Sequence, residues 1–457
     1  MTKKEPMRVF TYVTNVFIVL TVMYLAIFTP YKYLLKTKMI SFYTIFGGYS
    51  AVMALLSVEG IAVGMIKPRE LLTRLKPTTV VQWGMIFYML FSFVSALLSK
   101  YSSTWIGTTR YEGFLTVAIY VTSFYFIAKF AKPSKWMMYA FGGAVTLFGV
   151  ISVIQLAGLP FLYNSGTNYY SGGVINAADY MIGTIGNVDF AAALLALIIP
   201  ILTLYVVKAK EKQRFLLLIP AILALFVLLK IWVLLGLVGT FAAGVLAFPY
   251  ALGLKKRGVT VYFIILTVLA LTALLVLYAV PFERGLFFEL HSILHGEVKE
   301  TFGTGRFHVW REVLGRIPDN LFFGTGPDTM VLDDAIKPFT RYDEAKGLIV
   351  RRIDLAHNEF LNVLYHQGIF AFLSYLAAAV GFLVSYFKNA VNNAAALITG
   401  AGVIGYAAAL MFGMTMPPIG VFFWVCLGLY EHYTASEPAV ISVAKAKKTH
   451  KKCVKYK

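Results

Sequence analysis

The sequence predicts an all-α protein that crosses a membrane many times, and three observations lead to this prediction. Of its 457 residues, 59% are hydrophobic and only 14% are charged, whereas soluble domains carry about 25% charged residues. Apolar windows of membrane-spanning length recur along the chain. The net charge of +19 is gathered in short runs between these windows and in the C-terminal tail. This distribution is typical of cytoplasmic loops and gives no reason to expect a nucleic-acid partner.

Twelve windows are predicted to be transmembrane helices. They lie near residues 9–29, 40–66, 79–99, 113–131, 137–159, 188–207, 215–230, 233–252, 259–281, 366–387, 394–414 and 419–434. The run from Phe215 to Leu252 is too long for one helix, and we expect it to be divided near Lys230. The division also keeps the basic run 255–257 on the cytoplasmic side when the N-terminus is cytoplasmic.

The loops and chain ends follow from this topology. Residues 1–281 hold nine helices with outer loops at 100–112 and 160–187, residues 282–365 form a large extracytoplasmic loop, residues 366–434 hold three helices, and residues 435–457 form a basic tail. Both termini are expected in the cytoplasm, with an uncleaved first helix. Cys426 and Cys453 lack metal-ligand spacing, and we expect no disulfide between them.

The large loop carries arginines in two groups. Arg306, Arg311 and Arg316 alternate with apolar residues at helical spacing, which predicts an amphipathic helix at the membrane interface. Arg351 and Arg352 precede the next membrane helix. Guanidinium groups suit bidentate binding of phosphate. Interfacial anchoring and surface ion pairs are the alternative interpretation.

The sequence His357-Asn358-Glu359 is predicted to open the tenth helix at the membrane surface. The free N–H groups of a helix start can bind an anion, and a histidine there can accept a proton from a hydroxyl group. Asp354 could orient the imidazole ring or cap the helix. A histidine that merely lies at the interface is the alternative.

Shorter polar motifs stand in the other outer segments. Arg110 and Glu112 lie at one helix entry, and Asn187 and Asp189 begin another, where polar side chains either cap the helix or bind a ligand. The Gly-Thr-Gly sequences at 303–305 and 324–326 lack the lysine and hydroxyl of a phosphate loop. We interpret both as turns.

Together these motifs resemble the O-antigen ligase and O-antigen polymerase superfamily of membrane glycosyltransferases. The resemblance covers the ranges 107–113, 183–189, 305–310, 324–328 and 354–368. Its most specific element is His357-Asn358, nine residues, then Gly368. Ala371 and Lys230 depart from the pattern, the latter because the family usually carries an arginine in that region.

The resemblance implies transfer of a glycan from an undecaprenyl-diphosphate carrier on the outer face of the cell membrane, without metal or other cofactor. The acceptor would be a glycan, a lipid, the cell wall or a protein, and polymerase and ligase remain equally open. The resemblance implies catalytic roles for His357 as the general base and Arg306 as the diphosphate clamp. The expected substrate-binding residues are Arg110, Asn187, Lys230, Arg351, Arg352, Asp354, Asn358 and Glu359.

Two other classes of function are compatible with the helix count. A flippase for lipid-linked oligosaccharides, or another secondary transporter, predicts repeated halves and ionisable residues at the bilayer midplane. The sequence shows no internal repeat, and its polar residues gather in the outer segments. A non-enzymatic assembly component is the third possibility, but it gives no reason for both His357 and Arg306.

Overall fold

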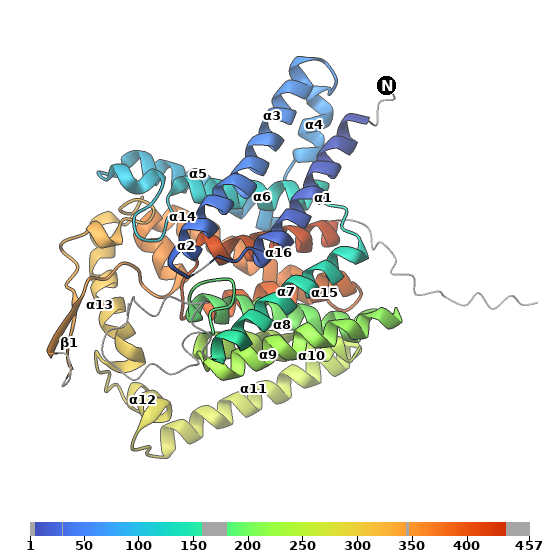
Figure 1. Cartoon of the computed structure of the whole chain (residues 1–457). Helices are drawn as coiled ribbons and strands as arrows, with labels where there is room; N and C mark the ends of the chain where they lie inside the picture. The colour runs from blue at the N-terminus through green and yellow to red at the C-terminus, as the bar shows by residue number, and fades with distance from the viewer. Residues whose placement is uncertain (1–4, 30, 158–180, 344–346, 436–457) are drawn as a thin grey trace, which may run out of the picture.

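A computed structural model describes residues 5–29, 31–157, 181–343 and 347–435, which form a helical bundle with a smaller layer at one end (Figure 1). The bundle contains α1 (Glu5–Ala26), α2 (Tyr31–Phe42), α3 (Gly48–Ala62), α4 (Pro68–Leu75), α5 (Val80–Leu98), α6 (Phe114–Phe130), α7 (Lys135–Leu156), α8 (Val188–Lys208), α9 (Leu218–Ile231), α10 (Leu234–Ala251), α11 (Lys256–Ala279), α14 (Glu359–Asn389), α15 (Ala394–Leu410) and α16 (Pro417–Ala435). Nine helical spans in the described residues are long and apolar enough to cross a membrane. The protein is therefore a predominantly α-helical, multi-pass membrane protein.

A helix lies at each of the twelve predicted positions in the described part of the chain. The predicted division near Lys230 is present, because α9 ends at Ile231 and Trp232 adopts the left-handed conformation before α10 begins. Helices α6 and α15 have only 17 residues each, and α16 is not among the nine spans. The total of twelve crossings therefore stays a prediction.

The second span begins earlier than its hydropathy indicated. Helices α2 and α3 join through one π-helical turn, so that the chain is helical from Tyr31 to Ala62. Lys38, which we expected in an outer loop, is fully buried in this run. Its Nζ donates to the carbonyl oxygens of Tyr24 (2.5 Å) and Leu25 (3.4 Å). The lysine thereby satisfies carbonyl groups at the end of α1 that have no partner within the helix.

Helices of similar hydropathy occupy very different places in the bundle. Helix α8 packs against α9, α10 and α15, and 78% of its most apolar window is buried. Helix α11 is as apolar, yet none of its residues is buried. An apolar helix with an unburied surface of this length is suited to contact with lipid.

The predicted large extracytoplasmic loop, residues 282–365, is called the outer segment below. It forms the layer at one end of the bundle (Figure 1). It contains α12 (Gly285–Leu294), α13 (Arg306–Arg316) and an antiparallel hairpin of β1 (Phe339–Asp343) and β2 (Gly347–Arg351), in which Phe339 pairs with Arg351. The hairpin is an addition to the expected all-α fold. The predicted amphipathic helix is present as α13, but its buried side packs on protein. Its Val309 and Val313 join a small core with Met330, Ile336, Ile353, Ala356 and Tyr365.

Helix α14 is interrupted at Gly368, the glycine of the most specific motif. Gly368 has φ 79° and ψ −177°, a conformation that is open essentially to glycine alone. The interruption leaves backbone groups free to pair with residues 321–326: Ile369 N–H donates to Leu321 O at 2.8 Å, and Gly326 N–H donates to His366 O at 2.8 Å. A β-carbon on Gly368 would lie 2.3 Å from Phe322 O. The motif glycine therefore joins the outer segment to a membrane helix.

We predict that Gly368→Ala destabilises the protein. The strained backbone alone should cost on the order of 1–3 kcal/mol, and the contact with Phe322 O adds to this. The measurement is the thermal midpoint of the detergent-solubilised protein. Gly244→Ala in α10 is the matched control, because a β-carbon there meets no atom within 4 Å. Equal midpoints for the two variants would contradict the proposed role of Gly368.

Candidate active site

The buried carboxylate of Asp328 holds the first outer loop, residues 100–112, in place. Asp328 Oδ2 accepts hydrogen bonds from the backbone N–H groups of Thr108 (2.6 Å), Arg110 (3.2 Å) and Glu112 (3.4 Å). The hydroxyl of Thr108 also donates to Asp328 O at 2.7 Å. Burial raises the pKa of Asp328, and the three backbone donors oppose that rise. Two motifs that are distant in the sequence, 107–113 and 324–328, are thus one structural unit.

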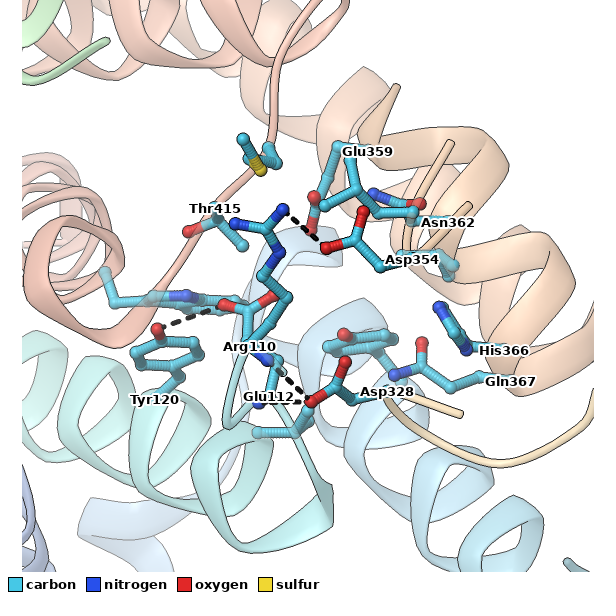
Figure 2. Close-up of a pocket in the computed structure, with 16 residues that line it drawn as sticks. Arg110, Glu112, Tyr120, Asp328, Asp354, Glu359, Asn362, His366, Gln367 and Thr415 are labelled. Carbon is cyan, nitrogen blue, oxygen red and sulfur yellow. Dashed lines mark hydrogen bonds and ion pairs between the residues drawn. The ribbon is translucent and has the colours of Figure 1, made fainter. Parts of the chain in front are cut away.

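This unit borders a small cavity of about 60 Å³ (Figure 2). Arg110 extends into it, and its Nη2 donates to Asp354 Oδ2 at 2.6 Å. The Nε–H of Arg110 is buried and has no hydrogen-bond partner within the described structure. An unpaired buried donor on a cation is energetically costly unless a ligand oxygen accepts from it. Arg110 is therefore suited to bind an anion at this position.

Two glutamates line the same cavity, Glu112 from the first outer loop and Glu359 from the start of α14 (Figure 2). The hydroxyl of Tyr120 donates to Glu112 Oε1 at 3.3 Å. Burial raises the pKa of Glu112 well above its usual value, and the charge of Glu359 raises it further. Glu112 is consequently favoured in its protonated form, in which it can donate a hydrogen bond. Glu359 was a predicted site residue, whereas Glu112 was noticed only as part of a motif.

His357 stands in the sequence between Leu355 and Glu359, two residues that line this cavity. Its backbone has φ 50°, an unusual conformation for a residue with a side chain. The pKa of His357 is lowered to about 4, chiefly by burial and also by the charges of Arg306 and Arg110, while Asp354 opposes this effect. The imidazole is therefore neutral at pH 7. A neutral imidazole retains a lone pair that can accept a proton.

Arg306 lies at the start of α13, directly after a left-handed turn. Gly303, Thr304 and Gly305 all have positive φ values, which confirms the interpretation of this sequence as a turn. Arg306 Nη1 donates to Gly303 O (2.9 Å) and to Thr304 Oγ1 (2.8 Å). Its Nε–H is buried and unpaired within the described residues, as in Arg110. Burial lowers the pKa of Arg306, and the carboxylate of Asp189 opposes that effect.

The two predicted asparagines act as helix caps. Asn187 Oδ1 accepts from the N–H groups of Asp189 (2.8 Å) and Phe190 (3.3 Å) at the start of α8. Asn358 Oδ1 accepts from Leu361 N–H (3.0 Å) at the start of α14. The sequence suggested Asp354 as a possible cap of this helix, but the structure shows that Asn358 is the cap. Capping explains the position of both asparagines without a ligand, so their substrate-binding roles stay predictions.

Two predicted cations, Lys230 and Arg352, are not gathered with this group. Lys230 is exposed near the end of α9, where its Nζ lies 5.8 Å from the ring centroid of Phe226. Arg352 is exposed and pairs with Asp334 at 3.2 Å. The backbone of Arg351 ends β2, where it pairs with Phe339. Most of the predicted outer loop 160–187 lies outside the described residues, which resume at 181.

The sequence did not single out Asp328 or His366 as site residues. His366 is buried, lines the cavity and has its Nδ1 3.1 Å from Gly326 O. Asp328 follows a glycine-rich turn in a motif, which was its only local signal. Among the described residues, no group of three or more His, Cys, Asp or Glu side chains is arranged to hold a metal ion.

Comparison with known proteins identifies part of the chain. No curated protein matches the sequence. A family model described as O-antigen ligase matches residues 232–376, which extend from the junction of α9 and α10 into α14. The match includes Arg306, His357 and Gly368 but ends short of Arg110 and Asn187 on the N-terminal side. Residues 232–376 of this membrane protein are therefore similar to the O-antigen ligase family.

Proposed function

We propose that this protein transfers a glycan from an undecaprenyl-diphosphate carrier to an acceptor hydroxyl or amine on the outer face of the cell membrane. The family match supports a membrane glycosyltransferase of the O-antigen ligase or polymerase type. One observation carries the more specific proposal: Arg110 and Arg306 each have a buried, unpaired Nε–H, and both act electrostatically on a neutral histidine. Cations with free donors beside a base are suited to a phosphate leaving group and an attacking nucleophile.

The arginines would bind the diphosphate of the donor. As the bond between the anomeric carbon and the diphosphate oxygen breaks, negative charge develops on the leaving group. Arg306 and Arg110 would stabilise that charge through their guanidinium donors. This arrangement supplies the positive charge without requiring a divalent ion, and the diphosphate brought by the donor removes the need for a nucleotide.

His357 would be the general base. Its neutral ring would accept the proton of the acceptor group as the acceptor heteroatom forms its bond to the anomeric carbon. Asp354 would act indirectly, because its ion pair with Arg110 positions that arginine. Glu112, in its protonated form, and Glu359 would interact with polar groups of a bound substrate. Asn358 would hold the start of α14, and so the direction of His357.

The proposed orientation places this site outside the cell. The positively charged runs at 67–76, 129–135 and 208–214 stand at the end of the helices away from the outer segment. Both termini would then be cytoplasmic by the positive-inside rule. The proposal requires this orientation, because carriers and acceptors of envelope glycans meet on the outer side.

Transfer is tested directly with purified protein in liposomes that contain undecaprenyl-diphosphate-linked oligosaccharides. The measurements are release of the carrier diphosphate and the size of the glycan product. A ladder in multiples of the repeat would assign a polymerase, and a single transfer to an added lipid, wall or protein acceptor would assign a ligase. No turnover with any of several donors and acceptors would contradict the proposed function.

We predict that His357→Ala abolishes transfer and leaves the thermal midpoint of the protein close to that of the wild type. The variant lacks the only proposed proton acceptor, and the rate should fall at least about 100-fold. His295→Ala at the end of α12 is the matched control, because this histidine is exposed and outside the cavity. Wild-type turnover by His357→Ala would remove the assignment of the base.

We predict that Arg306→Lys lowers kcat about 100-fold, because lysine keeps the charge but loses the Nε donor and the planar fork. Arg284→Lys makes the same chemical change at an exposed arginine that is not among the residues lining the cavity and should leave kcat unchanged. Turnover and KM for the lipid-linked donor are measured for both variants. Equal values of kcat for the two would argue against the proposed clamp.

We predict different pH dependences for kcat/KM and kcat. In the protein without substrate, His357 is protonated below pH 4 and can no longer accept a proton. We therefore expect kcat/KM to fall on the acid side near pH 4. Bound diphosphate offsets the charges of Arg306 and Arg110, which favours the protonated imidazole and raises its pKa. The acid limb of kcat should therefore lie at higher pH. Rate profiles measured between pH 3.5 and 9 in which both limbs coincide would contradict this electrostatic linkage.

A further inference from the structure

A second cavity lies at the other end of the helices that carry the candidate active site. Helices α5, α6, α14 and α16 have one end near the first cavity, and their opposite ends line a cavity of about 1180 Å³ together with α1 and α4. The lining residues Thr79, Phe130, Asn389 and His432 mark these four helix ends. The cavity therefore lies at the level of the opposite membrane surface.

Cations dominate the charged lining of this cavity. The positively charged residues are Lys67, Arg69, Arg74, Lys76 and Lys129, and Glu70 is the one carboxylate among the lining residues. Lys67, Arg69 and Lys76 form no ion pair within the described part of the chain. Five cations that converge on one hollow repel one another unless an anion lies among them.

Two of these cations are held in place by hydrogen bonds between helices. Arg74 Nη2 donates to Lys129 O at 2.8 Å, and Lys129 Nζ donates to Lys76 O at 2.7 Å. Each cation uses one donor in this way and keeps others available. The positive-inside rule explains why basic residues are present on this surface. It does not explain why they are cross-connected around one cavity.

The remaining walls suit an amphiphile. Met7 supplies apolar surface beside the cations, and Thr78 and Thr79 supply hydroxyl groups. Phe130 is itself buried. The lining has five cations and one carboxylate, Glu70. The carboxylate of Glu431 also acts electrostatically on Lys129. Positive charge still exceeds negative charge among these described residues, which favours binding of an anion from another molecule.

We propose that this cavity binds the phosphate group of an anionic phospholipid, in the membrane leaflet opposite the candidate active site. Basic hollows between membrane helices at the surface are suited to such headgroups. Arg74, with its planar fork, and the lysine ammonium groups would contact the phosphate, and Met7 would contact the start of the acyl chains. The proposal does not depend on glycan transfer.

The test compares lipid binding by two doubly substituted proteins. Lys67→Gln/Lys76→Gln removes two cavity cations that have no ion pair in the described structure. The matched control, Lys255→Gln/Lys256→Gln, removes two exposed lysines at the start of α11, outside the cavity. Delipidated full-length protein is titrated with phosphatidylglycerol or with phosphatidylcholine, and bound lipid is counted by native mass spectrometry. Equal thermal midpoints without lipid establish that both variants fold.

The wild type and the control should bind phosphatidylglycerol more tightly than phosphatidylcholine. The affinity of Lys67→Gln/Lys76→Gln for phosphatidylglycerol should be about 30-fold weaker. Addition of inorganic phosphate distinguishes the two sources of this group: a lipid site should keep its lipid, whereas displacement at millimolar phosphate would assign the cavity to a free anion and overturn the proposal. Equal weakening in both variants, or no preference between the lipids, would also overturn it.

Discussion

The hydrogen bonds to the Asp328 carboxylate are the interaction on which the candidate site depends. A buried carboxylate requires donors, and Asp328 takes three of them from the backbone of the first outer loop. These three hydrogen bonds hold the loop in the conformation in which Arg110 reaches Asp354. The same outer turn approaches the interruption of α14 at Gly368. Arg110 and the residues that precede α14 are therefore held in their relative positions by this turn as well as by the direct ion pair between Arg110 and Asp354.

The electrostatics of the site follow from burial. Burial of the His357 imidazole lowers its pKa, and the charges of Arg306 and Arg110 add to this effect. Each of the two guanidinium groups keeps a donor without a partner in the described structure. An anion bound among these groups would accept hydrogen bonds from the unpaired arginine donors and would raise the pKa of His357. A diphosphate would pair with the arginines and at the same time make the histidine a stronger base. Substrate binding and base strength are thus coupled through charge.

The two cavities use the same helices for opposite membrane surfaces. Near the outer segment, α5, α6, α14 and α16 meet at a small cavity where carboxylates and an arginine are interleaved. At their other ends the same helices surround a much larger cavity in which cations predominate. A compact polar centre suits chemistry on a positioned group, whereas a wide basic hollow suits a headgroup that is held by charge. The rigid helices between them keep the two centres apart.

The sequence by itself determined the positions of the membrane helices, since length and hydropathy are local properties. It also indicated the cap at Asn187, which depends on residues close in sequence, and the family resemblance singled out Gly368. At the start of α14 the sequence suggested Asp354 as the cap, whereas the structure has Asn358 in that role. Only the tertiary structure decided that α8 is enclosed while the equally apolar α11 is not, that Glu112 joins the cavity, and that Lys230 stays outside it. These outcomes depend on which distant segments meet, and neither hydropathy nor periodicity records the distance between such segments.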